Sequence, residues 1–259
     1  MNPSISEPAV ASGATSAHST PAVQTRRGRI FVNRLLLRAM LFSMGLIAVG
    51  IYRLSADKRT AWRFAKAQAR NLARLCGVRV RVRGTDQLGP GPYIFVSNHQ
   101  SHFDIALLLG YLPGINRFAA KNELFRQPVL GLVLGTLGMI PIDRDDPMAS
   151  IEVLNRMAAE GHSTIIFPEG TRSRDGTLLP FKKGAFVAAV RLGVPIVPVA
   201  CKGTAQIMPK GKHLSIVPGD VELVVTEPMP TADLDYADRD RLRDLVRQRI
   251  ASELATPQS

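Results

Sequence analysis

Two short polar segments hold the residues with the clearest chemical potential in this sequence. The first contains His99 and Asp104, five residues apart. A turn between them would bring the Asp104 carboxylate to one imidazole nitrogen, fix the tautomer and leave the other nitrogen to take a proton from a nucleophile. From this spacing alone, a catalytic pair and an ordinary hydrogen-bonded loop histidine are comparable interpretations. Ser101 lies between them, but no Gly-x-Ser-x-Gly turn surrounds it. We therefore prefer direct transfer of a group from one substrate to another over a mechanism in which Ser101 is the nucleophile.

The second segment reads Phe167-Pro168-Glu169-Gly170-Thr171-Arg172-Ser173 and follows a short apolar run. Gly170 permits close approach of the backbone to a ligand, Thr171 offers a hydroxyl, and Arg172 can bind phosphate through two hydrogen bonds. Glu169 is an unusual neighbour for an anion site, and would either bind a glycerol hydroxyl or hold Arg172 in place. Taken alone, the Glu-Gly pair is typical of a generic turn.

Bulk composition limits the class of protein and of partner. The chain has 259 residues, 46% of them hydrophobic, enough for one substantial globular domain with additions at its ends. A formal net charge of +12 predicts an anionic partner such as a membrane surface or a phosphorylated substrate. Nucleic acid is the weakest choice, because few aromatic residues lie among the basic ones and no recognised nucleic-acid motif is present. Cys76 and Cys201 share no metal-like spacing with histidine, so we expect neither a metal site nor a disulfide framework.

The N-terminal part of the chain divides into two regions. Residues 1–29 are mostly Ser, Ala, Thr and Pro without an apolar period, and predict a disordered tail. Residues 30–52 are mostly apolar and about long enough to cross a bilayer, but Asn33, Arg34 and Arg38 interrupt them. A spanning helix and an interfacial helix therefore both fit. A cleaved signal peptide is a third interpretation, although no convincing cleavage site follows.

Residues 58–76 predict a basic amphipathic helix. Basic residues recur at spacings of 4, 3, 4 and 4, which form one stripe of a helix: Arg59, Arg63, Lys66, Arg70 and Arg74. Such a helix suits an anionic lipid surface, whereas the alternative is the solvated face of an ordinary core-packing helix. Because the apolar residues 30–52 come directly before it, we favour a membrane-associated helical pair over residues 30–76.

Residues 77–259 alternate between strand and helix patterns. Short apolar or alternating runs predict strands at 78–83, 93–96, 117–121, 139–142, 164–167 and 196–200, and a hairpin of 213–217 with 221–225. Periodic stretches predict helices at 104–112, 148–160, 183–192 and 236–253. This alternation predicts an α/β domain with a mixed central sheet flanked by helices. Both polar segments follow a predicted strand, which is where many α/β active sites lie.

Four blocks in a fixed order carry a resemblance to a known family. They are residues 98–104, Lys121 to Leu124 with 138–144, residues 167–173, and Val194 to Val199. Together they resemble the glycerolipid acyltransferases, specifically the bacterial 1-acyl-sn-glycerol-3-phosphate acyltransferases. Any one block alone is a weak match, but four in order make chance improbable. The matching core runs over residues 93–199.

The resemblance implies a role for each matching position. His99 is the general base and Asp104 its orienting partner. The positions implied to bind the acceptor's phosphate or to shape the acceptor pocket are Lys121, Arg144, Glu169, Gly170, Thr171 and Arg172. Enzymes of this kind form no acyl-enzyme and require no metal and no cofactor beyond the acyl donor.

The resemblance also implies substrates and a location. An acyl group moves from acyl-CoA or acyl-carrier protein to a lysophospholipid, here lysophosphatidic acid, giving phosphatidic acid. The near alternative is the same chemistry on another lysolipid, such as a lyso-ornithine lipid, and the alternative from another class is a non-catalytic basic membrane-binding module. The expected location is the cytoplasmic face of the inner membrane, either attached or anchored by a single pass.

Overall fold

The computed structural model describes residues 31–33, 35, 36, 39, 43, 46, 47, 50, 58–136, 138–143, 147–209 and 215–258. The predicted tail, most of the predicted apolar helix and Arg144 therefore lie outside the described residues. Within the described part, no helix combines the length and the apolar character needed to cross a bilayer. Among the described residues of the N-terminal segment, Asn33 is hydrogen-bonded to the domain. The buried Asn33 Nδ2 donates to the carbonyl oxygens of Cys76 at 3.0 Å and Ile216 at 2.8 Å.

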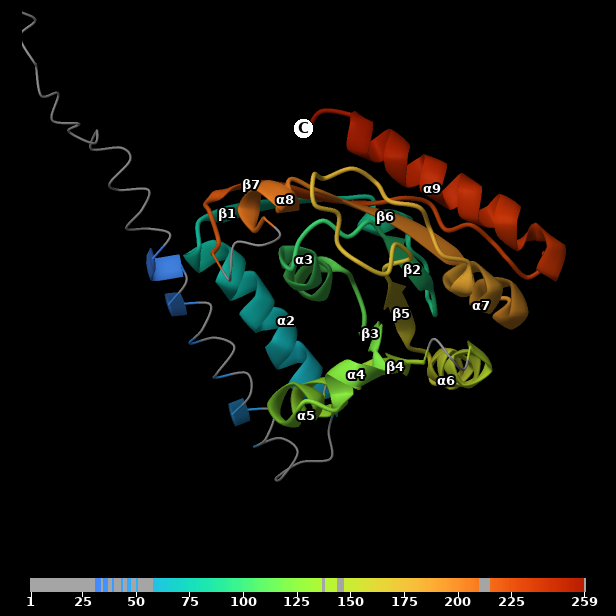
Figure 1. Ribbon diagram of the computed structural model, residues 1–259, viewed down its shortest axis with the longest axis horizontal. Helices are drawn as coiled ribbons and strands as arrows, with labels where there is room; N and C mark the ends of the chain where they lie inside the picture. Colours follow the sequence, from blue (N-terminus) through green and yellow to red (C-terminus); the bar gives the residue numbers. More distant parts are fainter. Residues whose placement is uncertain are drawn as a thin grey trace, which may run out of the picture.

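A seven-stranded sheet forms the centre of the domain, in the order β1-β7-β6-β2-β5-β3-β4 (Figure 1). Neighbouring strands are parallel except for β6 and β7, which are antiparallel, so the sheet is mixed as predicted. In spatial order the strands are Val78–Arg83 (β1), Gly219–Val225 (β7), Ile196–Lys202 (β6), Ile94–Ser97 (β2), Ser163–Ile166 (β5), Asn116–Lys121 (β3) and Ile140–Ile142 (β4). The carboxyl ends of the five strands from β6 to β4 consequently meet at one edge of the sheet.

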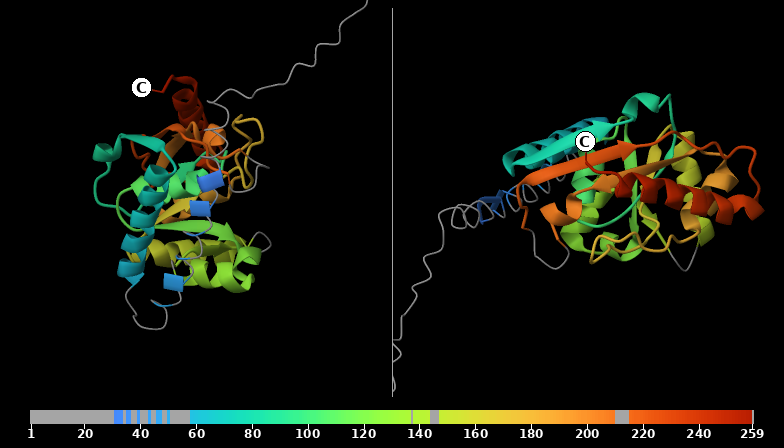
Figure 2. Two further views of the ribbon diagram at one scale, coloured as in Figure 1. Left: turned by 90° about the vertical axis from the view of Figure 1, so that its left-hand side faces the viewer. Right: turned by 90° about the horizontal axis from the view of Figure 1, so that it is seen from above.

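Helices cover both faces of the sheet, giving three layers (Figures 1 and 2). One face carries Lys58–Leu75 (α2) and Phe103–Tyr111 (α3), and the other carries Pro147–Ala159 (α6), Gly184–Leu192 (α7) and Arg239–Ala255 (α9). The shorter elements are Thr85–Gln87 (η1), Asn122–Phe125 (α4), Pro128–Thr136 (α5), Thr204–Ile207 (α8) and Tyr236–Asp238 (η2). The predicted α/β class and the central sheet flanked by helices are therefore confirmed.

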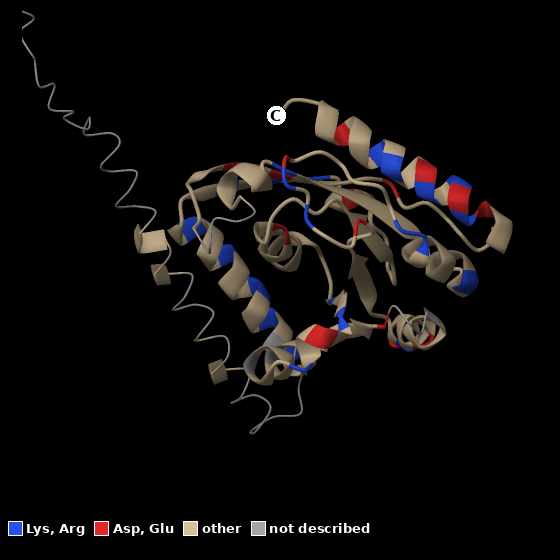
Figure 3. Ribbon diagram, in the orientation of Figure 1, with Lys and Arg blue, Asp and Glu red and all other residues tan. Residues whose placement is uncertain are grey.

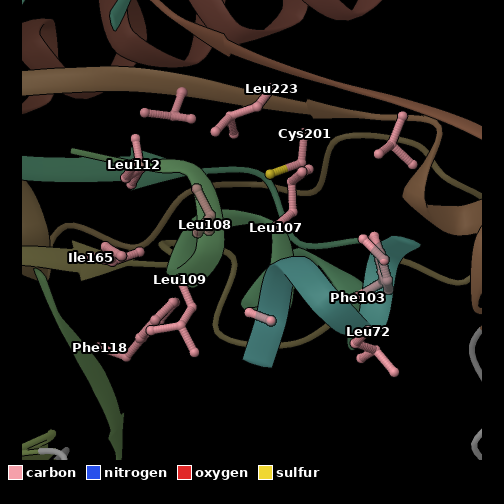
Figure 4. Close-up of a cluster of buried hydrophobic side chains, with 14 of the residues drawn as sticks. Leu72, Phe103, Leu107, Leu108, Leu109, Leu112, Phe118, Ile165, Cys201 and Leu223 are labelled. Carbon is pink, nitrogen blue, oxygen red and sulfur yellow. The ribbon is translucent and has the colours of Figure 1, made fainter. Parts of the chain in front are cut away.

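Two hydrophobic clusters form because successive strand residues point to opposite faces of the sheet. Phe95 in β2 joins the cluster under α2 and α3, whereas its neighbours Ile94 and Val96 join the cluster under α6, α7 and α9. Figure 4 shows the first cluster, where residues of α2, α3 and the sheet meet, including Leu72, Leu107 and Leu223. Full burial of one such side chain contributes about 1.5–3 kcal/mol, so the two clusters hold the strands and their connecting loops in fixed positions.

Helix α2 is basic and amphipathic as predicted, and the structure shows what its apolar side contacts. Trp62, Ala65, Ala69 and Leu72 are buried in the domain's own core. This side therefore matches the core-packing alternative, and the membrane-associated helical pair is not supported by these contacts. Figure 3 shows basic residues along the length of α2, and the four arginines of the stripe are exposed.

Two members of the basic stripe cap the end of α3. Lys66 Nζ donates to the carbonyl oxygens of Leu112 and Gly114, and Arg70 Nε donates to that of Gly110 at 2.6 Å. Cations near a helix carboxyl end offset its unpaired carbonyl groups and its dipole. Burial, followed by the nearby charge of Arg70, lowers the pKa of Lys66 to about 8. These two side chains therefore join α2 to α3.

The predicted hairpin near the C-terminus is wrong in its first strand. Residues 221–225 belong to β7, but Ser215 to Pro218 form no strand, and residues 213 and 214 lie outside the described residues. The reason is that both edges of β7 are already paired, one with β1 and the other with β6. No edge is left for a hairpin partner.

Candidate active site

The turn between β2 and α3 brings His99 and Asp104 into contact. His99 Nδ1 lies 2.8 Å from Asp104 Oδ2, and that oxygen also accepts the backbone N–H groups of Gln100 and Ser101, each at 2.8 Å. Asp104 is fully buried in the first turn of α3, where the helix dipole stabilises a carboxylate. The His99 side chain stays 14% exposed. With Nδ1 held by Asp104, Nε2 is the nitrogen that can accept a proton.

Side chains next to His99 fix this turn to β6 and to the segment after it. Asn98 makes two hydrogen bonds with the Cys201 backbone: its Nδ2 donates to the carbonyl at 3.0 Å, and its Oδ1 accepts the N–H at 2.8 Å. Ser101 Oγ donates to the Met208 carbonyl at 2.8 Å and accepts the Phe103 N–H at 3.0 Å. The Ser101 hydroxyl is buried, and it both donates and accepts a hydrogen bond. Its role is therefore structural, and it is not placed for nucleophilic attack.

The Phe167 ring was not anticipated as part of the site. It stacks on the His99 imidazole with ring centroids 4.0 Å apart and planes at 16°, and its centroid also lies 6.3 Å from that of the Phe118 ring. Phe167 follows β5, which lies between β2 and β3. Its apolar neighbours in the sequence indicated only a buried strand, and the stack depends on strand order that periodicity does not contain.

The second polar segment contacts the backbone of the first. Glu169 Oε1 accepts the His99 N–H at 2.7 Å, and Oε2 accepts the Leu179 N–H at 3.1 Å. The Ser173 N–H in turn donates to the His99 carbonyl at 2.8 Å. Glu169 is only 4% exposed. Burial raises the pKa of its carboxyl group, and the two backbone donors partly oppose that rise.

Of the other predicted site residues, those that the structure describes share this edge of the sheet without joining the His99–Asp104 pair. The pKa of His102 is lowered first by desolvation and next by the positive charge of Arg172. This effect indicates that Arg172 lies near His102. Lys121 is exposed at the end of β3, two strands from β2. Gly170 has a φ of 68°, a conformation that favours glycine, and Thr171 beside it is exposed. Arg144 lies outside the described residues.

The described part of the chain contains no cluster of side chains that could form a metal centre. There, no group of three or more His, Cys, Asp and Glu side chains is arranged to hold a metal ion. The chemistry that this arrangement can perform is proton transfer by an oriented imidazole, beside a segment that offers a guanidinium and a hydroxyl.

Comparisons with known proteins identify a family that shares this sequence pattern. The Acyltransferase family model matches residues 79–202. A chloroplastic 1-acyl-sn-glycerol-3-phosphate acyltransferase of Brassica napus is 40% identical over 166 residues, which are 63% of this chain and 46% of that protein. The alpha form of 1-acyl-sn-glycerol-3-phosphate acyltransferase from Homo sapiens is 38% identical over 178 residues, 67% of this chain and 62% of that protein. The chain thus spans about half of the length of the Brassica relative.

A solved structure extends the agreement to the whole fold. The crystal structure of the 1-acyl-sn-glycerophosphate (LPA) acyltransferase PlsC from Thermotoga maritima matches with a TM-score of 0.73 and 27% identity, over 90% of this chain and 100% of that one. Its mixed sheet and flanking helices correspond to those described above. Residues 79–202, which contain His99, Asp104 and the Glu169 segment, therefore form a domain of the Acyltransferase family.

Proposed function

We propose that the protein transfers a fatty acyl group from a thioester to the free hydroxyl of 1-acyl-glycerol-3-phosphate, giving phosphatidic acid. The donor is acyl-CoA or acyl-carrier protein, and no cofactor is needed besides it. The single observation that carries the proposal is the His99–Asp104 pair, joined at 2.8 Å with the Asp104 carboxylate fully buried. The family domain and the activities named for its relatives support the choice of reaction.

The mechanism follows from which nitrogen of His99 is left to react. Asp104 holds Nδ1, so Nε2 takes the proton of the acceptor hydroxyl as its oxygen attacks the thioester carbonyl. The tetrahedral intermediate then expels the thiolate, which takes up the proton from the imidazolium. General-base assistance of this kind contributes about 10²- to 10⁴-fold in rate. No acyl-enzyme is needed, because the acceptor oxygen attacks the donor directly.

Three basic side chains from the predicted site would bind the acceptor's phosphate. Lys121, Arg144 and Arg172 are proposed for this role, since guanidinium and ammonium groups form charge-assisted hydrogen bonds with phosphate. The backbone around Glu169, Gly170 and Thr171 would shape the pocket for the glycerol part. Arg172 is near enough to the His99 turn for its positive charge to lower the pKa of His102, after the larger effect of desolvation.

We further propose that the enzyme works at the cytoplasmic face of the inner membrane, where a lysolipid acceptor resides. Two features support membrane attachment through residues 30–76, by one pass or by surface binding. Among the described N-terminal residues, Phe31, Val32, Leu35 and Leu46 expose between 51% and 69% of their surface. The exposed arginines of α2 lie beside them in sequence and would attract anionic headgroups.

The decisive experiment uses purified full-length protein, labelled acyl-CoA and acyl-carrier protein donors, and a panel of lysolipid acceptors. We expect His99→Ala to lower the rate of acyl transfer to lysophosphatidic acid by about 10²- to 10⁴-fold. The matched control is His162→Ala, because His162 lies before β5 at the opposite edge of the sheet and its variant should keep full activity.

Three other outcomes would contradict parts of the proposal. Unchanged transfer by the His99→Ala protein would exclude this histidine as the base. Activity on a lyso-ornithine lipid but not on lysophosphatidic acid would reassign the acceptor. Binding to vesicles without transfer to any acceptor would indicate a non-catalytic membrane-binding module.

A further inference from the structure

The His99 peptide is held from outside its own turn. Its N–H donates to Glu169 Oε1 at 2.7 Å, and its carbonyl accepts the Ser173 N–H at 2.8 Å. One residue further on, Gln100 Nε2 donates to the Gly176 carbonyl at 2.7 Å. The loop from residue 167 to 180 therefore holds the segment that carries the imidazole at three points, through hydrogen bonds that do not involve the imidazole itself.

Glu169 is the one ionisable side chain among these contacts, and both of its oxygens already have donors. Oε1 accepts from His99, while Oε2 accepts the Leu179 N–H at 3.1 Å. Only 4% of the residue is exposed. Each carboxylate oxygen keeps a second lone pair, but this burial leaves a ligand hydroxyl almost no access to it.

We infer that Glu169 is a positioning residue: it joins the His99 backbone to the Leu179 backbone and so sets where the imidazole stands, and it does not bind the acceptor. The inference rests on the proposed acyl transfer for its kinetic consequence, but not for the contact itself. Asp104 orients the His99 ring, whereas Glu169 fixes the peptide from which the ring projects. These are separate constraints on one base.

The chemistry of the carboxylate explains why glutamate is suited to this position. A carboxylate offers two acceptor oxygens and no donor, which matches two converging N–H groups. Glutamine keeps the size but presents an NH₂ group to one of them, so one contact becomes repulsive. Aspartate keeps the charge but is one methylene shorter, so it cannot reach both donors. Displacement of a catalytic group by about 1 Å can cost on the order of 10²-fold in rate.

The test compares Glu169→Gln and Glu169→Asp with the wild type, by steady-state kinetics with lysophosphatidic acid and by amide hydrogen exchange followed by NMR. Glu152→Gln on α6 is the matched control, because Glu152 is exposed and lies outside this edge. We expect kcat to fall about 10- to 100-fold in both Glu169 variants. The KM for the acceptor should stay within about twofold, because no acceptor contact is lost. The amides of His99 and Leu179 should exchange faster than in the wild type.

A rise of about tenfold or more in the acceptor KM, with kcat and amide exchange unchanged, would overturn the inference and assign Glu169 to acceptor binding. If Glu169→Gln does not fold, Glu169→Asp decides between the two outcomes with the same measurements. If the wild type transfers no acyl group, the proposed function fails, while amide exchange at His99 and Leu179 still decides whether Glu169 holds the two segments together.

Discussion

Asp104 combines complete burial with three hydrogen bonds to one of its oxygens, from the imidazole and from two backbone N–H groups. The neighbouring imidazole and backbone N–H groups are donors and need an acceptor in this place. Replacing Asp104 by Asn introduces an NH₂ group, which is a donor, and this favours the wrong imidazole tautomer. We expect Asp104→Asn to lower kcat by about 10²- to 10⁴-fold. Steady-state kinetics checks this, with Asp86→Asn on the exposed η1 as the control. Activity near that of the control would mean that His99 acts without this partner.

The raised pKa of Glu169 makes a prediction about stability against pH. Because burial raises this pKa above its ordinary value of 4.5, the folded protein binds the proton more tightly than the unfolded chain. Stability from this group is complete below pH 4.5 and is lost as the pH rises through the higher folded-state pKa. Urea unfolding from pH 4 to pH 7 should therefore show wild-type protein losing stability relative to Glu169→Gln. Parallel pH profiles for the two proteins would contradict this.

At the residue scale, local spacing predicted the pair but not its support. His99 and Asp104 lie within one turn, so the sequence contains their relation directly. Phe167 and Glu169 reach His99 only because β5 lies beside β2, and strand order is a tertiary property. Asn98 could have been suspected, because a polar residue directly after a buried strand must find hydrogen-bond partners. Its partner, Cys201, could not.

At the scale of elements, Asn98 is the side chain that ties the catalytic turn to β6. Asn98→Ala leaves the N–H and the carbonyl of the buried Cys201 without these partners. We expect a loss of about 1–3 kcal/mol in the free energy of unfolding. Urea denaturation measures it, with Asn155→Ala on the exposed side of α6 as a control that should change stability by less than about 0.5 kcal/mol. Equal effects of the two variants would show that this bridge carries little of the stability.

Periodicity predicted the type of most elements but not what covers them. Helix α2 has the period expected from its arginines, yet only the fold shows that its apolar side packs on α3 and that Lys66 and Arg70 cap α3. The hairpin prediction failed for the same reason. The apolar residues before Gly219 have a strand-like pattern, but β1, more than a hundred residues earlier, takes the edge of β7 that a hairpin partner would need.

At the scale of the whole molecule, the charge of +12 is unevenly arranged. Figure 3 shows basic residues along α2, whereas on α9 basic and acidic residues alternate. If the α2 stripe faces an anionic membrane, the variant Arg59→Gln/Arg63→Gln should bind phosphatidylglycerol vesicles more weakly by about 1 kcal/mol per arginine. Vesicle sedimentation at low salt measures this, and Arg241→Gln/Arg249→Gln on the exposed side of α9 is the charge-matched control. Equal binding by both variants would contradict a lipid-facing α2.

The position of β7 has a consequence for how the protein is made. β1 pairs in register with β7, from Val78 with Gly219 to Arg83 with Val224, and Arg79 contacts Asp220 at 2.6 Å across 141 residues. At about 5–20 residues per second, β1 leaves the ribosome on the order of ten seconds before its partner exists. β6 also gains its second neighbour only then. A chain stopped before Gly219 would therefore leave β1 and β6 without their β7 partner, and should be captured by chaperones or aggregate. The sheet therefore cannot be completed until residues 219–225 have been made.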